Sequence, residues 1–340
     1  MKTATAKKEN SAPSSNALEK WGFLYTSELK SVNEVIIKLT NDGTTPLIGL
    51  LAEHIIKSGG KRLRPILVLL SAKMCGYSGE RHVNLAAAIE FIHTATLLHD
   101  DVVDESKLRR GQKTANEQWG NAASVLVGDF LLSRAFQLMA RDGNLEILRI
   151  LSDTSATMSE GEVKQLSTQN DIETSIETYI DVVERKTAKL FSAACEIGPV
   201  IAGKSSLEQE EMARFGHNLG VAFQIVDDVL DYSAKQEQLG KTIGEDFSEG
   251  KVTLPMILAY ESADKKEKDF WLRIINDRLV ADTDFRTAIT IMTKRRLLDK
   301  AMSVAKDYAK LALAEISNFP DCDEKQALLE LADFAVNRPY

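Results

Sequence analysis

Apolar residues return every three or four positions along nearly the whole chain from about residue 17 onward, and no stretch sustains a period of two. This period places apolar side chains on one side of an α-helix, whereas a half-buried β-strand requires a period of two. Only 7 prolines interrupt the 340 residues, so long helices can form. The sequence therefore predicts an all-α protein of about ten or more helices. We expect helices over residues 19–40, 46–58, 64–75, 83–105, 114–141, 144–168, 175–202, 207–233, 252–262, 266–279, 285–293, 295–317 and 323–336.

Neither a low-complexity linker nor a fixed-period repeat divides the chain after its first residues. We expect residues 1–18 to be a disordered N-terminal tail and residues 19–340 to form a single all-α domain. Two glycine-containing, charged segments are expected to be loops, residues 106–114 and 233–251. Each of these loops directly follows a cluster of aspartates.

The formal net charge of −8 argues against a general nucleic-acid binder, so an anionic ligand must be met by locally placed Lys and Arg. The three cysteines, Cys75, Cys195 and Cys322, fit neither a disulfide framework nor a zinc site. No apolar run approaches the roughly 20 residues that span a bilayer. These features predict a soluble, cytoplasmic protein.

The acidic clusters are "LLHDDVVD" at residues 97–104 and "QIVDDVLD" at residues 224–231, and both have the spacing DDxxD. Residues three and four apart on a helix are neighbours, so the first and third aspartates of each motif share a face. A single copy on a polar helix would be a solvated helix end. Here the preceding helices are apolar on nearly every side, so the acidic ends should face the interior and need cations. The aspartates concerned are Asp100, Asp101, Asp104, Asp227, Asp228 and Asp231.

Carboxylate oxygens without a cysteine partner favour Mg²⁺, which commonly completes its shell with water and substrate phosphate oxygens. Two facing clusters therefore predict a polyphosphate bound between them through metal. An alternative is a di-iron bundle site, because Glu90 and His93 have the Glu-x-x-His spacing. Such a site needs two copies of the spacing, and none of the other four histidines follows a Glu by three residues.

Basic residues gather in "SGGKRLRP" at residues 58–65 and in the loop after the first aspartate motif. The spacing of a phosphate-binding P-loop is absent, and a basic loop alone would be a weak signal. Several guanidinium groups together suit bidentate phosphate binding. A second anion, bound without metal, is therefore expected near Lys61, Arg62, Arg64, Arg109 and Arg110.

From about Ser58 to Pro255, these motifs resemble the trans-polyprenyl diphosphate synthases, which elongate isoprenyl chains head to tail. The shared motifs are GGKRLRP, both DDxxD sequences, the following RRG, the Lys-Thr pair at 186–187 and the GK…EGKVTLP segment. The resemblance implies an isoprenoid-synthase-type helical bundle around a central cavity. It also implies a homodimer that uses Mg²⁺, three ions per active site, with Mn²⁺ as a substitute.

The resemblance further assigns roles to individual residues, and His93, two turns before Asp100, can face the same cavity. It implies that all six aspartates hold Mg²⁺, with Asp101 and Asp228 less directly placed than the others. The diphosphate of isopentenyl diphosphate would bind Lys61, Arg64, His93 and Arg110, and the allylic diphosphate would bind Arg109, Lys186, Lys241 and Lys251.

The implied reaction is the successive trans condensation of isopentenyl diphosphate onto an allylic primer such as farnesyl diphosphate. Positive charge stabilises the departing diphosphate, and the oxygens of Thr187 and Gln224 stabilise the allylic cation. One departure from shorter-chain relatives is "EGEVKQL", which has Glu162 and Gln165 where those relatives carry Gln and Asp.

Product length should depend on the residues that precede the first motif on its helix. Ala95 and Thr96 are small, whereas relatives with short products have a bulky aromatic residue there. We therefore expect a long product of about C40 to C50, a quinone side-chain precursor, with Phe136 as the floor of its tunnel and transient membrane contact at release. The alternative, that the alanine only permits close helix packing, would allow a farnesyl or geranylgeranyl product.

Two other classes of protein share these features. A terpene cyclase also ionises an allylic diphosphate with metal, but it would not need an isopentenyl site or a second full DDxxD motif. A non-catalytic subunit of a heteromeric prenyl synthase would be expected to have lost metal-binding aspartates, and both motifs are intact here.

Overall fold

The computed structural model describes residues 26–41, 45–57, 62–109, 111–233, 244–277 and 282–337. The described residues are mainly helical, which confirms the all-α prediction. The longer helices are α2 (Thr26–Asn41), α3 (Pro46–Lys57), α4 (Leu63–Met74), α5 (Arg81–Val103), α7 (Asn121–Asp142), α8 (Leu145–Thr168), α9 (Ile176–Val183), α10 (Lys189–Ile201), α11 (Ser206–Ser233), α14 (Leu254–Glu261), α15 (Lys265–Asp277), α16 (Asp282–Lys294), α17 (Leu297–Glu315) and α18 (Asp323–Val336). The short elements are β1 (Leu108–Arg109), β2 (Gln112–Lys113), α6 (Ala115–Trp119), the π-helix η1 (Glu184–Ala188) and α13 (Glu245–Ser248).

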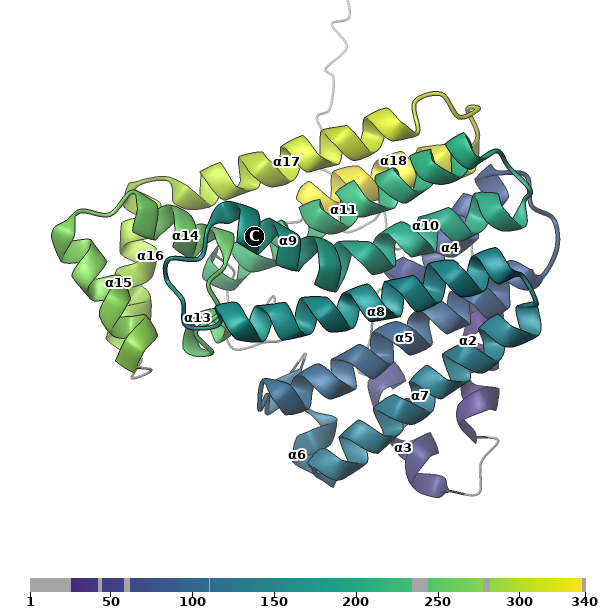
Figure 1. The fold of residues 1–340 in the computed structure, drawn as a ribbon, viewed down its shortest axis with the longest axis horizontal. Helices are drawn as coiled ribbons and strands as arrows, with labels where there is room; N and C mark the ends of the chain where they lie inside the picture. The colour runs from purple at the N-terminus through teal and green to yellow at the C-terminus, as the bar shows by residue number, and fades with distance from the viewer. Residues whose placement is uncertain are drawn as a thin grey trace, which may run out of the picture.

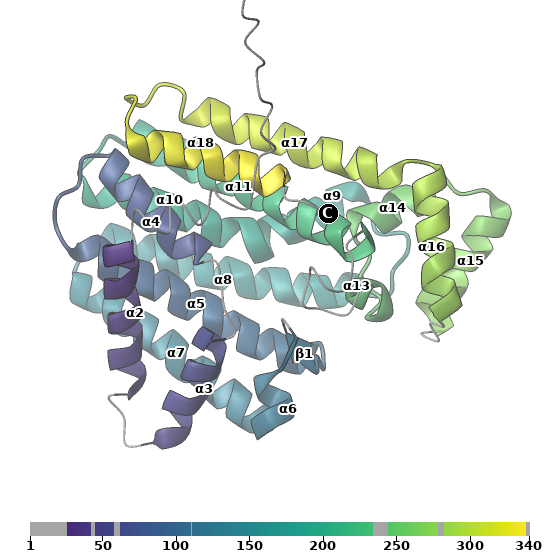
Figure 2. The same ribbon diagram turned by 180° about the vertical axis from the view of Figure 1, so that it is seen from behind.

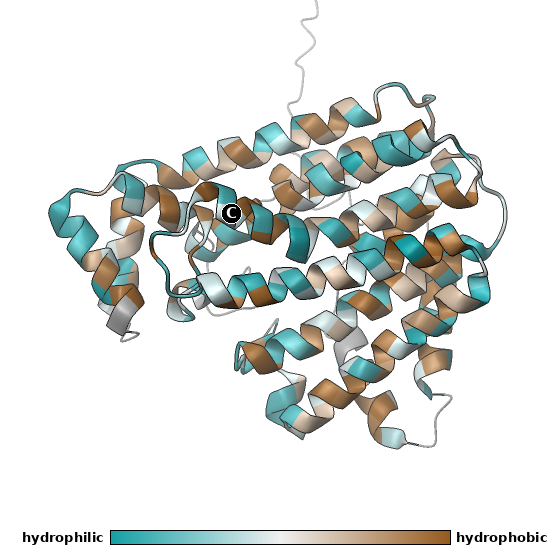
Figure 3. Ribbon diagram, viewed as in Figure 1, coloured by the Kyte–Doolittle hydropathy of each residue, from teal (hydrophilic) through white to brown (hydrophobic). Residues whose placement is uncertain are grey.

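The long helices α8, α10, α11 and α17 run along the length of the molecule, with α5 and α7 beside them and α14 to α16 at one end (Figure 1). Seen from behind, α2 and α3 lie in front of α5 and α7, and α4 packs against α10 and α5 (Figure 2). Apolar and polar residues are interspersed along each long helix (Figure 3), as the helical period predicts. The largest core forms where α4, α5, α10 and α11 meet.

Close helix crossings hold this core together. A Cβ atom on Gly216 of α11 would lie 2.4 Å from the carbonyl oxygen of Phe191 on α10. One on Gly198 of α10 would lie 2.4 Å from the backbone nitrogen of Ala72 on α4. Any larger residue would push these helices apart, so the glycines fix the spacing between the helices that carry the functional motifs.

The structure corrects four of the predicted boundaries. The helix predicted over 114–141 is broken at Gly120, whose φ of 84° belongs to the left-handed region and ends α6. The helix predicted over 175–202 is interrupted by η1. The loop predicted over 106–114 contains the antiparallel β1–β2 pair, and the loop predicted over 233–251 contains α13. The tail predicted over 1–18 lies outside the described residues.

Within the described part of the chain, α7 is the one helix whose length and composition would allow it to cross a membrane. It packs against α5, and 39% of its apolar window is buried. Val125, Leu126 and Phe136 on α7 remain exposed. Helices buried in the core of a protein pass the same test of length and composition.

Candidate active site

The first aspartate motif lies at the C-terminal end of α5. Asp100 and Asp104 are partly exposed, and Asp101 is buried at 4% exposure. Oδ1 of Asp101 accepts hydrogen bonds from Arg109 Nε at 2.9 Å and Arg109 Nη2 at 2.7 Å. The β1–β2 pair turns back immediately after α5, and this turn brings Arg109 against the helix end. The motif is therefore divided into two accessible carboxylates and one buried carboxylate that holds an arginine.

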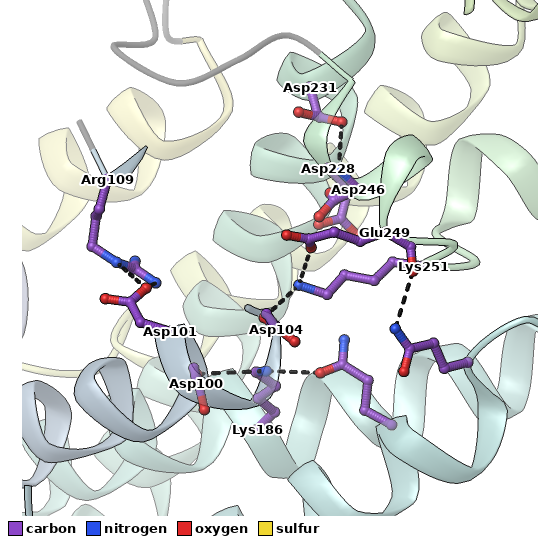
Figure 4. A network of polar contacts seen from close by, with 12 residues as sticks. Asp100, Asp101, Asp104, Arg109, Lys186, Asp228, Asp231, Asp246, Glu249 and Lys251 are labelled. Carbon is purple, nitrogen blue, oxygen red and sulfur yellow. Dashed lines mark hydrogen bonds and ion pairs between the residues drawn. The ribbon is translucent and has the colours of Figure 1, made fainter. Parts of the chain in front are cut away.

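Two lysines from distant parts of the chain lie beside the accessible carboxylates (Figure 4). Lys251 Nζ donates to Asp104 Oδ2 at 2.8 Å and lies 2.7 Å from Glu249 Oε2. Lys186 Nζ lies 3.6 Å from Asp100 Oδ2. Burial alone would lower the pKa of Lys251, but the nearby carboxylates, Asp246 first among them, raise it above its usual value. Lys251 is therefore charged, and the amino groups of both lysines lie close to the end of α5.

The second motif lies near the C-terminal end of α11 and is arranged differently. Asp227 is partly exposed, whereas Asp228 and Asp231 are buried at 4% and 7% exposure. Asp231 Oδ2 accepts the backbone N–H of Asp246 at 3.2 Å, which attaches the α13 segment to α11. Only one of the three carboxylates of this motif is therefore accessible.

Asp228 belongs to a chain of hydrogen bonds that joins three helices. Tyr179 Oη on α9 donates to Asp228 Oδ2 at 2.5 Å, and Gln224 Nε2 donates to Asp228 Oδ1 at 2.8 Å. Thr187 Oγ1 on η1 donates to Gln224 Oε1 at 2.8 Å. A π-helix widens one turn of the backbone and is frequent at functional sites. Thr187 and Lys186 both lie in this widened turn.

Glu162 and Gln165 on α8 hold Lys186 from the side opposite the aspartates. Lys186 Nζ donates to Glu162 Oε2 and to Gln165 Oε1, each at 2.7 Å. Burial, together with the negative charge of Asp100, raises the pKa of Glu162 to about 7 even though Lys186 opposes the shift. The two residues that differ from those of shorter-chain relatives thus both contact the amino group of Lys186.

Two aspartates of the site have raised pKa values, because they are buried and lie close to other carboxylates. Burial, with the neighbouring Asp104 carboxylate, raises the pKa of Asp100. Burial, together with Asp246 and Asp227, also raises the pKa of Asp228 well above its ordinary value. Such shifts indicate carboxylates that lack enough positive charge near them. A site of this kind gains stability when cations bind.

The donor set fits Mg²⁺, because the accessible groups Asp100, Asp104 and Asp227 offer oxygen ligands only. Among the described residues, no three His, Cys, Asp or Glu side chains are close enough together to hold one ion. Mg²⁺ is usually bound by one or two carboxylates, and it takes its other ligands from water and phosphate. A metal ion here would therefore share its coordination shell with an anionic ligand.

A second group of basic residues lies where α4 and α5 approach each other. Arg64 Nη1 donates to His93 Nε2 at 3.0 Å, and the guanidinium carbon lies 4.5 Å from the centre of the Phe191 ring. Arg64 Nε is buried without a hydrogen-bond partner among the described residues, and burial lowers the pKa of Arg64 to about 10. Arg62 pairs with Glu90. Glu90 and His93, the pair with the di-iron spacing, thus each contact an arginine.

Of the remaining predicted site residues, some lie outside the described part of the chain and others lie on α5. Lys61, Arg110 and Lys241 lie outside the described residues. Ala95 is 2% exposed, and the hydroxyl of Thr96 donates to the carbonyl of His93 at 2.8 Å. The chain-length role of Ala95 and Thr96 stays a prediction.

Ala95 is one turn before His99, whose ring lies against Gly128, so Ala95 is on the side of α5 that faces α7. A product tunnel that passes Ala95 would therefore run between these two helices. Phe136 on α7 is 42% exposed, so within one chain it does not close a buried tunnel. Its role as a floor remains a prediction that requires a second subunit over α7.

Sequence reasoning assigned no role to Tyr179, Asp246 or Glu249. Asp246 and Glu249 lie in "GEDFSEGK", where their charges beside a glycine-containing loop were the available signal. The loop is fastened by Gln169 at the end of α8, whose Nε2 donates to the carbonyl of Glu249 at 3.0 Å. Tyr179 lies 49 positions from Asp228, and no local pattern marks it.

Residues 45–292 match the model of the family described as polyprenyl synthetase. The octaprenyl diphosphate synthase of Haemophilus influenzae is 44% identical over 313 residues, which cover 92% of this chain and 94% of that protein. The crystal structure of a decaprenyl diphosphate synthase from Rhodobacter capsulatus has a TM-score of 0.90 at 43% identity and covers 94% of this chain and 99% of that chain.

A second solved structure is a polyprenyl synthase from Caulobacter crescentus complexed with calcium and isoprenyl diphosphate. It has a TM-score of 0.92 at 44% identity and covers 98% of this chain and 99% of that chain. Fold and site together define an all-α prenyltransferase. The chain belongs to the polyprenyl synthetase family, and the similar proteins named above include long-chain synthases. The resemblance found in the sequence is thereby confirmed.

Proposed function

We propose that the protein adds isopentenyl diphosphate repeatedly, in trans, to an allylic primer such as farnesyl diphosphate, and releases a polyprenyl diphosphate of eight to ten isoprene units, the range of the octaprenyl and decaprenyl relatives. One observation carries the proposal. The 2.8 Å contact between Lys251 and Asp104 joins the segment after α11 to the end of α5. This contact supports a single anionic ligand bound between the two motifs.

Mg²⁺ would be held by Asp100, Asp104 and Asp227, with three ions per site and Mn²⁺ as a substitute. Bound Mg²⁺ supplies positive charge that stabilises the diphosphate as the allylic carbon–oxygen bond breaks. The support for this assignment is that these are the three partly exposed aspartates of the two motifs. Asp101, Asp228 and Asp231 are buried against protein groups and stand outside this set.

The charged side chains divide between two substrates. Arg109, Lys186 and Lys251 bind the allylic diphosphate, and Lys241, which lies outside the described residues, joins them. Arg64 and His93, with Lys61 and Arg110, bind the diphosphate of isopentenyl diphosphate. The Nε–H of Arg64 is buried and has no hydrogen-bond partner within the described part of the chain. This supports the division, because a donor in that position requires an acceptor.

The bond changes follow from this placement. The allylic carbon–oxygen bond breaks, and the electron pair leaves with the diphosphate. The hydroxyl oxygen of Thr187 and the amide oxygen of Gln224 stabilise the cation that forms. The double bond of isopentenyl diphosphate supplies the electrons of the new carbon–carbon bond, and the departing diphosphate accepts the proton that is then lost. The apolar residues around the site keep water from the cation.

The same proposal covers assembly and location. Residues 26–337 would act as one domain, because helices from both ends of this range share one core. The exposed apolar residues of α7 support a homodimer through that helix. We place the enzyme in the cytoplasm, consistent with its three free cysteines. The product would leave through transient membrane contact and serve as a quinone side-chain precursor.

The test is incubation of the purified protein with farnesyl diphosphate and labelled isopentenyl diphosphate, with Mg²⁺ or with a chelator, followed by chromatography. We expect C40 to C50 products that depend on the metal. A product that stops at C20 would support the short-chain alternative. Absence of any condensation would contradict the function as a whole.

A separate variant tests the prediction about product length. Ala95→Phe adds a ring on the side of α5 that faces α7, so we expect shorter products at a similar rate of isopentenyl diphosphate consumption. Ala88→Phe is not a suitable control, because Ala88 is fully buried in the core. Val163→Phe on the exposed side of α8 is the matched control and should leave product length unchanged. An unchanged length in Ala95→Phe would contradict the role of Ala95.

A further inference from the structure

We propose that Asp228 positions Gln224 and does not bind a metal ion, and that Tyr179 is the residue that holds Asp228 in this role. The inference rests on the proposed function, since it concerns the step in which the allylic cation forms. The family resemblance placed Asp228 among the metal ligands and gave Tyr179 no part.

Both oxygens of the Asp228 carboxylate are engaged by protein donors. Oδ2 accepts from the Tyr179 hydroxyl at 2.5 Å, and Oδ1 accepts from Gln224 Nε2 at 2.8 Å. Asp228 is 4% exposed and Tyr179 is 6% exposed. A metal ion at this carboxylate would have to share each oxygen with a buried protein donor. Asp227, partly exposed on the same helix, meets no such obstacle.

The contact with Asp228 decides which way the Gln224 amide points. Oδ1 of Asp228 accepts the hydrogen bond from Gln224, so the amide turns its NH₂ group toward Asp228 and its oxygen toward Thr187. The observed 2.8 Å bond from Thr187 Oγ1 to Gln224 Oε1 matches that orientation. The amide oxygen keeps a second lone pair, and the threonine hydroxyl keeps its own lone pairs. These are the groups that can face a cation.

Asp228 also changes the electron distribution in the amide. A hydrogen-bond acceptor at Nε2 polarises the group and increases the negative charge on Oε1. Without Asp228 the amide is free to rotate by half a turn. It would then direct an N–H toward the cation, which would oppose cation formation. The aspartate thus acts on the reaction through Gln224, from the side of the residue opposite the substrate.

Tyr179 supplies the second hydrogen-bond donor to the buried Asp228 carboxyl group. It comes from α9, directly before the π-helix that carries Lys186 and Thr187. The Tyr179–Asp228 bond therefore ties α11 to the segment that holds Thr187. Without this bond, the position of Gln224 relative to Thr187 would be less well fixed.

A double-mutant cycle tests the proposal. Asp228→Asn replaces one of the two acceptor oxygens by an NH₂ donor, so Gln224 Nε2 and the Tyr179 hydroxyl no longer both donate to this side chain. It should lower kcat about 100-fold while the KM for both substrates and the Mg²⁺ concentration for half-maximal rate stay within about threefold. Gln224→Leu removes the group on which Asp228 acts. In the Gln224→Leu background, Asp228→Asn should therefore cost less than about threefold.

Tyr179→Phe is a second variant, with a smaller expected loss of kcat. It leaves Oδ2 of Asp228 without a donor and should lower kcat about tenfold at an unchanged Mg²⁺ requirement. Circular dichroism melting of each variant separates folding from catalysis. If Asp228→Asn does not fold, the tyrosine variant alone decides, and full activity in it would overturn the proposal.

Asp227→Asn is the comparison for metal binding, and its rate should recover in part at high Mg²⁺. Recovery of Asp228→Asn at high Mg²⁺, or losses that multiply in the double variant, would overturn the proposal and restore Asp228 as a ligand. A wild-type protein without condensation activity would instead contradict the proposed function itself.

Discussion

The two DDxxD motifs have the same spacing, yet they differ in how many of their aspartates are accessible. At the end of α5, Asp100 and Asp104 are accessible, and only Asp101 is buried. Near the end of α11, Asp227 alone is accessible, and the other two are buried. Helical spacing decides which carboxylates are neighbours, whereas the surrounding elements decide which of them remain free for a cation.

The buried members also obtain their partners by different routes. Asp101 binds Arg109, eight residues further along the chain, because the β1–β2 pair folds back at once. Asp228 binds Tyr179, 49 residues earlier, because α9 packs against α11. The first arrangement is local and the second depends on the tertiary fold. Variants that separate the two arrangements follow, from the largest expected effect to the smallest.

Loss of an accessible carboxylate should have the largest effect. Asp104→Asn removes an oxygen ligand from the first motif and should lower the condensation rate about 1,000-fold, with a raised Mg²⁺ requirement. Asp231→Asn, which alters a buried residue of the second motif, should have a clearly smaller effect on that requirement. Rates measured across a Mg²⁺ titration distinguish the two. Equal shifts in both variants would break the distinction between accessible and buried positions.

Lys186 lies beside Asp100 of the first motif. Lys186→Gln removes a charge located 3.6 Å from Asp100 and should lower kcat/KM for the allylic substrate about 100-fold. The KM for isopentenyl diphosphate should change little, because that substrate is assigned to Arg64 and His93. Steady-state kinetics with each substrate varied in turn would show this. An equal loss for both substrates would mean that the two anion sites are not separate.

Crowding of carboxylates at the first motif predicts a pH-dependent stability. The pKa of Glu162 is raised to about 7 by burial and by Asp100, so the folded state holds this proton more tightly than the unfolded chain does. Its contribution is complete below the unfolded pKa, near 4.5, and is lost as pH rises through about 7.

Urea unfolding without metal measures this contribution. Between pH 5 and pH 8, Glu162→Gln should lose about 2 kcal/mol less stability than the wild type. Glu160→Gln, which alters an exposed residue of the same helix, is the control and should follow the wild type. If Glu162→Gln and the wild type lose stability in parallel, Glu162 does not titrate in this range.

The smallest effect should come from the local pair at the first motif. Asp101→Asn weakens the hold on Arg109 and should lower allylic kcat/KM about tenfold, with no change in the Mg²⁺ requirement. Arg109→Lys should give a similar loss, since a lysine cannot reproduce the two contacts of the guanidinium group. If Asp101→Asn raises the Mg²⁺ requirement as Asp104→Asn does, Asp101 is itself a ligand.

Much of the fold could be predicted from the sequence, because helix formation depends on neighbours three and four residues apart. The predicted helices over 207–233 and 323–336 agree closely with α11 and α18. The break at Gly120 was missed, since a glycine within an apolar period does not reveal its φ angle. The π-helix was missed for a similar reason: one wider turn scarcely changes the spacing of apolar residues.

The sequence by itself determined the presence of two acidic helix ends, the shared face of the first and third aspartates in each, and the basic residues available to them. These properties are local, because they follow from the geometry of a helix and the residues next to it. Only the tertiary structure decided that Asp101 and Asp228 serve other side chains and that Lys251 contacts Asp104. Those choices depend on which distant helices pack together, and sequence spacing carries no record of that packing.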